Sequence, residues 1–242
     1  MNILLTNDDG IGCEGLLKLA EALRGRGGYT IYVIAPEGDR SGVSHSISLR
    51  EPVRIREYAE NTWTCSGTPA DCVMVALLGG LPLIPDLVVA GINAGPNLGT
   101  DIIYSGTAAA ARQAALHHIP AIALSLVHLG GAFFWDPAVA FVLEGLEDMM
   151  ALWTRDTFLN VNIPNSSQLS LDTAITHPSR RQYNDRLAVF EAPDGHRYFF
   201  IEGGSIVTEG EPGSDWEAVS RNQVSISPVF IHPVTGQDRA KG

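Results

Sequence analysis

The sequence has little cysteine and no long hydrophobic run. Cys13, Cys65 and Cys72 are an odd number and form no Cys-x-x-Cys pair, which argues against a disulfide framework and suits a reducing compartment. No apolar stretch approaches the about 20 residues that a transmembrane helix needs. The first residues, MNILLTNDDG, lack the basic segment of a signal peptide. We therefore expect a cytoplasmic protein that does not bind membranes.

Basic residues are also scarce. Lys and Arg number 16 against 27 Asp and Glu, which gives a formal net charge of −11. Because binding to duplex DNA needs a positive surface, we expect no duplex nucleic acid as partner. A small anionic substrate remains compatible with this charge, since a few backbone amides or a metal ion reverse its sign locally.

Apolar strands and amphipathic helices alternate over the first two thirds of the chain. Strands are expected at residues 3–5, 29–35, 86–92, 121–126 and 158–163, and helices at 14–26, 69–78, 105–117 and 136–153. This alternation predicts an α/β fold with a mostly parallel sheet flanked by helices. Residues 47–66 break the pattern and predict a β excursion in place of a crossover helix.

The helical periodicity is lost after Pro164. Further strands are expected at residues 186–191, 197–202 and 223–231, and Asp194-Gly195 predicts a hairpin turn between the first two. We therefore expect an α/β core at residues 1–165 and a β-rich C-terminal appendage at 166–242. A two-stranded hairpin is marginal in water, so it would dock either on its own α/β core or on a second subunit.

Polar residues follow three strands of the predicted sheet. They occur at residues 7–10, 39–45 and 93–107. Because ligands bind at the carboxyl ends of parallel strands, we expect these residues to meet at one edge of the sheet. Their oxygen-rich side chains favour Mg²⁺ or Mn²⁺ over Zn²⁺.

Asp8 and Asp9 are two adjacent carboxylates directly after a hydrophobic strand. They repel each other unless they are solvated or bridged by a cation. The same residues could instead form an Asx turn that caps the next helix.

The segment GINAGPNLGTDIIYSGT at residues 91–107 is rich in glycine. It is expected to bring backbone amides and the N-terminus of the following helix to a phosphate, or else to be a surface loop in which Ser105 caps the helix. No P-loop, dinucleotide fingerprint or Gly-x-Ser-x-Gly elbow is present. Residues 67–73 predict an ordinary helix start, with Thr68 as cap and Pro69 in the first turn.

Five ordered segments of the sequence resemble the survival protein E (SurE) family. They are NDDG at 7–10, APEGDRSGVSHS at 35–46, GTPADCV at 67–73, GINAGPNLGTDIIYSGT at 91–107 and NVNIP at 160–164. The resemblance spans residues 1–165 and continues more weakly at 213–228, where Asn222-Gln223 replaces the usual Gly-Tyr. It implies a Rossmann-like α/β domain and a β-rich part used in oligomerisation. It also implies one divalent cation per subunit, Mg²⁺ or Mn²⁺, at Asp8, Asp9, Ser41 and Asn93, and phosphate binding by Asn97, Ser105, Gly106 and Thr107.

Members of this family are metal-dependent phosphatases that act on nucleoside monophosphates. The resemblance implies a 5′-nucleotidase that tolerates 3′-monophosphates and short polyphosphate. Metal-activated water would attack the phosphorus, with Asp8 and Asp9 as the catalytic residues; the rival is Asp8 as a covalent nucleophile. A nucleotide-binding regulatory module without turnover and a sugar-nucleotide transferase are the alternative functions. The resemblance favours a homodimer or homotetramer over a monomer, and the sequence identifies no residue that reads the base.

Overall fold

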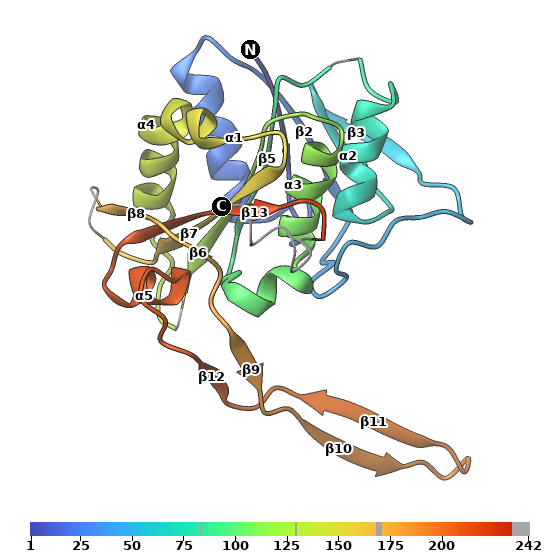
Figure 1. The fold of residues 1–242 in the computed structure, drawn as a ribbon. Helices are drawn as coiled ribbons and strands as arrows, with labels where there is room; N and C mark the ends of the chain where they lie inside the picture. Colours follow the sequence, from blue (N-terminus) through green and yellow to red (C-terminus); the bar gives the residue numbers. More distant parts are fainter. Residues whose placement is uncertain (83, 129, 168–170, 234–242) are drawn as a thin grey trace.

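A nine-stranded mixed sheet with helices on both faces forms the body of the protein, which confirms the expected α/β class (Figure 1). The computed structural model describes residues 1–82, 84–128, 130–167 and 171–233. The strand order is β3-β4-β2-β1-β5-β6-β7-β13-β8. No helix within these described ranges is long and apolar enough to cross a membrane. The cytoplasmic location stays a prediction.

Five parallel strands form the centre of the sheet. They are β1 (Asn2–Thr6), β2 (Thr30–Pro36), β5 (Leu87–Asn93), β6 (Ala121–Val127) and β7 (Thr157–Pro164). At one edge, β4 (Thr62–Cys65) runs parallel to β2 and β3 (Ile55–Ala59) antiparallel to β4, which confirms the β excursion. At the other edge, β13 (Val224–Phe230) pairs antiparallel with β7 and parallel with β8 (Thr173–Ile175).

Helices cover both faces of the sheet. Helices α1 (Glu14–Arg26) and α4 (Trp135–Leu152) pack on one face, and α2 (Pro69–Leu77) and α3 (Gly106–Leu116) pack on the other. Side chains of a strand alternate between faces, so Ile3 and Leu5 join the first core and Leu4 joins the second. Helix α2 begins as expected, because Thr68 forms a capping box with Asp71 and Pro69 occupies the first turn.

The chain after Pro164 first completes the sheet and then leaves it. Strands β8 and β13, from the expected appendage, belong to the same sheet as the α/β core, and the short helix α5 (Asp215–Ser220) precedes β13. Strands β9 (Arg181–Tyr183) and β12 (Ile206–Thr208) pair antiparallel, as do β10 (Arg186–Glu191) and β11 (Arg197–Glu202). We call residues 181–208 the arm. Residues 168–170 and 234–242 of the expected appendage lie outside the described residues.

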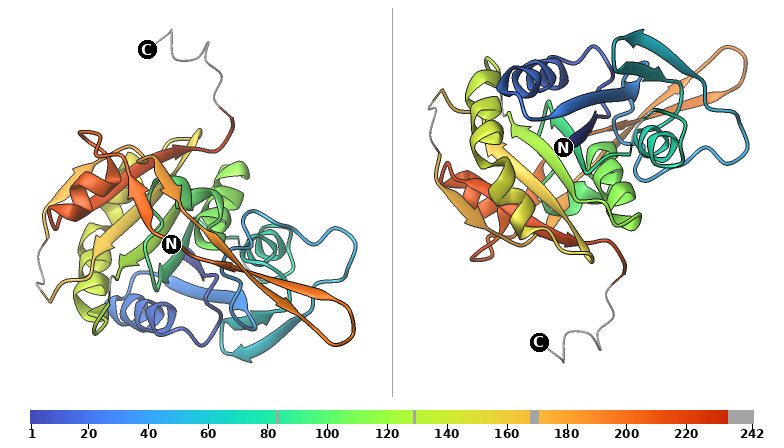
Figure 2. Two further views of the ribbon diagram at one scale, coloured as in Figure 1. Left: turned by 90° about the horizontal axis from the view of Figure 1, so that it is seen from below. Right: turned by 90° about the horizontal axis from the view of Figure 1, so that it is seen from above.

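The tip of the arm is the hairpin that the sequence predicted. Strands β10 and β11 have the expected bounds, and Gly195 adopts a φ of 84° in the turn between them, a left-handed conformation that glycine reaches without strain. The hairpin extends away from the body (Figure 1), and in the view from below it crosses in front of the body (Figure 2). All six residues of β11 are exposed.

A residue with a positive φ lies just before β13. Asn222 has a φ of 59°. Asparagine tolerates this left-handed conformation better than most residues do. Strand β13 therefore keeps a regular register with β7, from Ser225 opposite Asn162 to Phe230 opposite Thr157.

Candidate active site

A cavity of about 780 Å³ opens beside the carboxyl ends of β1 and β5, at the sheet edge where the strand-end argument placed the site. Its volume lies within the range of small-molecule pockets. Five of the eight predicted site residues line it: Asp8, Ser41, Asn93, Asn97 and Ser105. The rest of its wall comprises Gly42, Pro96, Asp101, Tyr104, Arg181, Tyr183, Asp185 and Ile206. The other three predicted residues, Asp9, Gly106 and Thr107, do not line the cavity but adjoin residues that do.

The turn after β1 is built by Asn7. Its Oδ1 accepts the backbone N–H of Gly10 at 3.1 Å, and its Nδ2 donates to the Gly10 carbonyl at 2.9 Å. Helix α1 starts at Glu14, and its cap residue, Cys13, makes no capping hydrogen bond. The side-chain hydrogen bonds that hold this turn thus come from Asn7, and neither Asp8 nor Asp9 caps α1.

The N-terminus of α3 holds the Asp8 carboxylate. The Gly106 N–H donates to Asp8 Oδ2 at 3.1 Å, and the Thr107 hydroxyl donates to Oδ1. Asp8 is only 4% exposed. Burial raises the pKa of Asp8 most, the Thr107 hydrogen bond lowers it, and repulsion from Asp9 raises it further. Two of the residues expected to bind phosphate therefore hydrogen-bond to Asp8 in this structure.

Asp9 is held from the neighbouring strand β5. Its Oδ2 accepts the Ala94 N–H at 3.1 Å and the Cys13 thiol at 3.6 Å. Burial is the main cause that raises the pKa of Asp9. The adjacent Asn93 uses its Nδ2 on the Gly95 carbonyl at 2.9 Å, and its Oδ1 accepts no hydrogen bond from the described part of the chain. Carboxylate and amide oxygens thus stand together at the ends of β1 and β5.

These donors fit a hard divalent cation. Asp8 and Asp9 are adjacent carboxylates with raised pKa values, and no Lys, Arg or His among the described residues forms an ion pair with either. Within the same described ranges, no three His, Cys, Asp or Glu side chains gather as a metal cluster. Further ligands would be neutral oxygens such as those of Asn93 and Ser41, which Mg²⁺ and Mn²⁺ accept. The Ser41 hydroxyl donates its hydrogen to Asp39 Oδ1, so its lone pairs remain for a cation.

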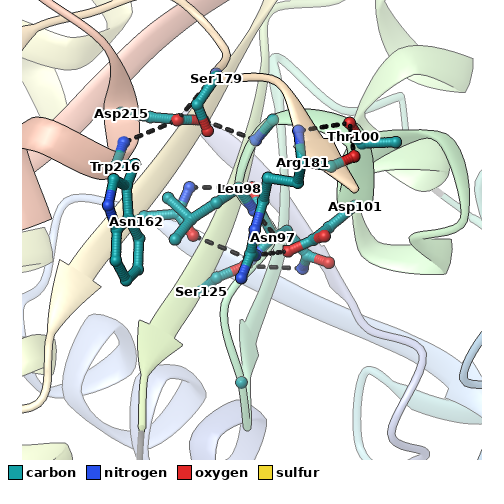
Figure 3. A network of polar contacts seen from close by, with 12 residues as sticks. Asn97, Leu98, Thr100, Asp101, Ser125, Asn162, Ser179, Arg181, Asp215 and Trp216 are labelled. Atoms are coloured by element: carbon teal, nitrogen blue, oxygen red, sulfur yellow. Dashed lines mark hydrogen bonds and ion pairs between the residues drawn. The ribbon is translucent and has the colours of Figure 1, made fainter. Parts of the chain in front are cut away.

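A network of polar contacts fixes Asn97 in the cavity wall (Figure 3). The Asn97 N–H donates to Asn162 Oδ1 at 2.9 Å, and its Nδ2 donates to Ser125 Oγ at 2.8 Å. The Asn97 carbonyl accepts from Nδ2 of Asn160 and Asn162 at 2.8 and 3.0 Å. Sequence reasoning missed this role of β7, although two asparagines at alternate positions of an apolar strand need buried partners.

The base of the arm contributes an ion pair to the same network (Figure 3). Arg181 Nη1 contacts Asp101 Oδ2, which also accepts the Leu98 N–H at 3.1 Å. The Arg181 side chain is 7% exposed and that of Asp101 15%. Burial raises the pKa of Asp101, and the attraction of Arg181 opposes this rise. The Thr100 hydroxyl donates to the Arg181 carbonyl at 3.0 Å, which anchors β9 to the short helix η1 (Gly99–Ile103).

The chain is similar to known proteins over nearly its whole length. Residues 3–185 match the family described as survival protein SurE. The 5′-nucleotidase SurE of Geobacter sulfurreducens is 40% identical over 233 residues, which cover 96% of this chain and 88% of that protein. The 5′-nucleotidase SurE of Geotalea uraniireducens is 41% identical over 240 residues, covering 96% and 93%. The crystal structure of the SurE protein from Aquifex aeolicus superposes with a TM-score of 0.83 at 33% identity and covers 98% of this chain and 96% of that one.

Proposed function

The chain belongs to the survival protein SurE family and is a 5′-nucleotidase, and we propose that it hydrolyses nucleoside 5′-monophosphates with one divalent cation per subunit, Mg²⁺ or Mn²⁺. The observation that carries this proposal is the pair of the buried Asp8 and the partly buried Asp9, which meets no cationic side chain in the described ranges. Such a pair is stabilised by a cation, and a cation beside a cavity of this size suits a phosphate ester. Activity on 3′-monophosphates and short polyphosphate is proposed as well.

Asp8, Asp9 and Asn93 Oδ1 would hold the cation, with the Ser41 oxygen as a further ligand. A divalent cation supplies a lowered pKa for a bound water and neutralises charge on the phosphoryl oxygens. Gly106 and Thr107 fix the orientation of the Asp8 carboxylate, and each of its oxygens keeps a further lone pair for the cation. In this proposal these two residues act on the substrate by positioning Asp8.

Ser105 and Asn97 supply hydrogen bonds to the phosphate. Ser105 Oγ accepts the Ala108 N–H at 3.0 Å, so the hydroxyl can donate its own hydrogen to a phosphoryl oxygen. Asn97 Nδ2 donates one of its two hydrogens to Ser125 and keeps the other. Both side chains are held before substrate binds, and such preorganised donors stabilise the charge of the transition state.

Water is proposed as the nucleophile in place of Asp8. The Asp8 side chain is buried, and both of its oxygens accept hydrogen bonds that stabilise the carboxylate and make it a weaker nucleophile. Rapid quenching with a labelled phosphate ester should leave no label on the protein. Labelled phosphate trapped at Asp8 would overturn the water mechanism.

Phosphate release tests the function directly. AMP and other phosphate esters are incubated with Mg²⁺, Mn²⁺, Co²⁺, Zn²⁺ or EDTA, and phosphate is measured. We expect metal-dependent release, reduced at least about 10²-fold in Asp8→Asn and in Asp9→Asn. Ser41→Ala should lose less, because water can replace a neutral hydroxyl. Asp136→Asn is the matched control. It removes an exposed carboxylate that pairs with Lys18 and does not line the cavity, so it should retain the wild-type rate.

Other outcomes of this assay favour the alternative functions. Tight binding of AMP without phosphate release under any of the metals would support a nucleotide-binding regulatory module. Product formation only in the presence of an acceptor would support a transferase. Near-normal rates in both aspartate variants at saturating metal would rule out the proposed site.

We further propose that the chain assembles as a homodimer or homotetramer. The exposed apolar side chains of the β10–β11 hairpin support this proposal, since a strand edge of this kind needs a partner surface. Residues 1–165 would form the catalytic core and residues 166–242 would serve assembly. Arg181, Tyr183 and Ile206 refine that division, because they line the cavity from within the second part.

A further inference from the structure

Part of the cavity wall is apolar and comes largely from the arm. Tyr104, Tyr183 and Ile206 line the cavity together with the polar residues described above. We call these three residues the apolar wall. Tyr104 is 56% exposed and Ile206 is 47% exposed. Large apolar side chains that remain exposed beside a polar cavity mark a place where a ligand covers them.

The geometry of the apolar wall is fixed by strand pairing. Tyr183 of β9 lies directly opposite Ile206 of β12, so their side chains share one face of this two-stranded sheet. The Tyr104 ring meets the Tyr183 ring edge-on, with 6.4 Å between centroids and an interplanar angle of 90°. The Thr100 and Asp101 contacts of Arg181 anchor β9 two residues before Tyr183. The wall is therefore built before any ligand arrives.

The apolar wall lies next to a residue that is proposed to bind the phosphate. Tyr104 directly precedes Ser105, the residue proposed to donate to the phosphate. The wall thus adjoins the phosphate-binding side of the same cavity. An aromatic ring with an exposed face stacks on a nucleobase, and this interaction accepts every base because each has a π-face.

We propose that Tyr104, Tyr183 and Ile206 bind the nucleobase of the substrate while the Asp8 side of the cavity holds its phosphate. This inference rests on the proposed function and names the base subsite of that same cavity. It gives the arm a role in substrate binding. Because stacking depends little on which base is bound, the apolar wall discriminates little between AMP and GMP. It favours both over a phosphate ester that has no base.

The test compares AMP with ribose 5-phosphate, which lacks the base. Tyr183→Ala and Tyr104→Leu should each lower kcat/KM for AMP by about 10-fold or more, mainly through KM. Each removes an aromatic ring that contacts the base, one through its face and the other, perpendicular to it, at the edge of the base. The loss with ribose 5-phosphate should be much smaller. Tyr183→Phe keeps the ring and should restore most of the AMP efficiency. Tyr58→Ala, which removes an exposed tyrosine of β3 that is not part of the cavity wall, should change neither substrate.

Two results would overturn the base subsite. If Tyr183→Ala and Tyr104→Leu each lose as much activity with ribose 5-phosphate as with AMP, the tyrosines act in folding or catalysis. If the variant that combines both substitutions keeps the wild-type kinetics with AMP, the tyrosines do not bind the substrate. If the proposed function itself is wrong, the wild type releases phosphate from neither AMP nor ribose 5-phosphate. The base subsite is then tested by equilibrium dialysis with AMP. Weaker AMP binding to Tyr183→Ala than to wild type supports the subsite, and equal binding overturns it.

Discussion

The Gly106 N–H lies 3.1 Å from Asp8 Oδ2 and ties the end of β1 to the start of α3. A Cβ at position 106 would lie 2.8 Å from the Asp8 Cβ and 3.0 Å from Oδ2. Glycine is therefore required here for close approach. This contact places a buried carboxylate on a helix N-terminus, where the amides and the helix dipole favour the charged form that burial disfavours.

Gly106→Ala should displace the Asp8 carboxylate. A displacement of about 1 Å in a catalytic group costs about 10²-fold, so we expect kcat to fall by this order with bound metal. Steady-state kinetics with Mn²⁺ measures the effect. Gly145→Ala in α4 is the matched control, since its new Cβ meets only Met149 Cε at 4.0 Å and alanine favours the helix. A Gly106→Ala enzyme with the wild-type rate would contradict the positioning role.

The buried pair Arg181 and Asp101 should behave as a unit. Arg181→Met leaves the Asp101 carboxylate buried beside no cation, and Asp101→Asn leaves the guanidinium without its anion, so each should lower the free energy of unfolding by about 3 kcal/mol. The double variant should lose much less than the sum of the two. Urea unfolding of all four proteins measures the coupling.

An exposed ion pair provides the control for this cycle. Arg54 and Glu37 pair at 2.9 Å, with 70% and 38% of their side chains exposed. Because solvent screens such a pair, Arg54→Met should cost at most about 1 kcal/mol. Additive losses for the Arg181 and Asp101 variants would show that the ion pair does not couple the arm to the loop.

Most of the sheet and its helices could be predicted from the sequence. The long strands have apolar side chains on one or both faces of the sheet, which leaves a clear apolar pattern along the chain. Ile3, Leu4 and Leu5 illustrate this, since neighbouring residues enter different cores. Strands β8, β9 and β12 are only three residues long, too short to show any alternation. The short helix η1 could not be predicted, because it lies in a glycine-rich segment whose composition is typical of a loop.

Asp8, Asn93 and Asn97 could be placed together from the sequence because they follow β1 and β5, which are neighbours in a parallel sheet. The same reasoning could not place Arg181 or Tyr183, because they belong to β9, which pairs with β12 in a separate two-stranded sheet. The arm is placed by contacts between residues far apart in sequence: Asp215 accepts the N–H groups of Gly99 and Ser179 at 2.7 and 2.9 Å. Such long-range hydrogen bonds leave no periodic signal in the sequence.

His45 should make stability depend on pH. It is partly buried, and its Nε2 lies 2.8 Å from Gln113 Oε1. Burial lowers the pKa of His45 below 6.5; the Gln113 hydrogen bond opposes this shift and Arg112 adds to it. The unfolded chain therefore binds the proton more tightly than the folded one. The contribution of His45 to stability is complete above about pH 6.5 and is lost as the pH falls below that value.

The His45→Gln variant isolates this contribution. Urea unfolding of both proteins between pH 7.5 and pH 5.5 should show a smaller loss of stability in the variant, because glutamine does not bind a proton. The quantity to compare is the difference between wild type and variant at each pH. A difference that does not change with pH would contradict the assignment.

The β10–β11 hairpin carries large apolar side chains with nothing to cover them within the described chain. Phe190, Phe200 and Ile201 are 58%, 57% and 77% exposed. Two antiparallel strands alone are marginally stable in water, so this surface should bury itself against a second copy of the chain. Sedimentation equilibrium at micromolar protein should give a mass of at least twice the 25.9 kDa of one chain.

Deleting residues 187–203 tests where that interface lies. The cut ends are Arg186 and Gly204, and they are close because the Gly204 N–H donates to Asp185 Oδ1 at 3.4 Å. Strands β9 and β12 remain to line the cavity. The shortened chain should sediment as a smaller species than wild type because it lacks the apolar strands. Tyr183 and Ile206 stay in place, so a loss of assembly can be separated from a loss of base binding by comparing AMP with ribose 5-phosphate. A wild-type mass of 25.9 kDa at every concentration would exclude the dimer, and an unchanged oligomer after the deletion would move the interface away from the hairpin.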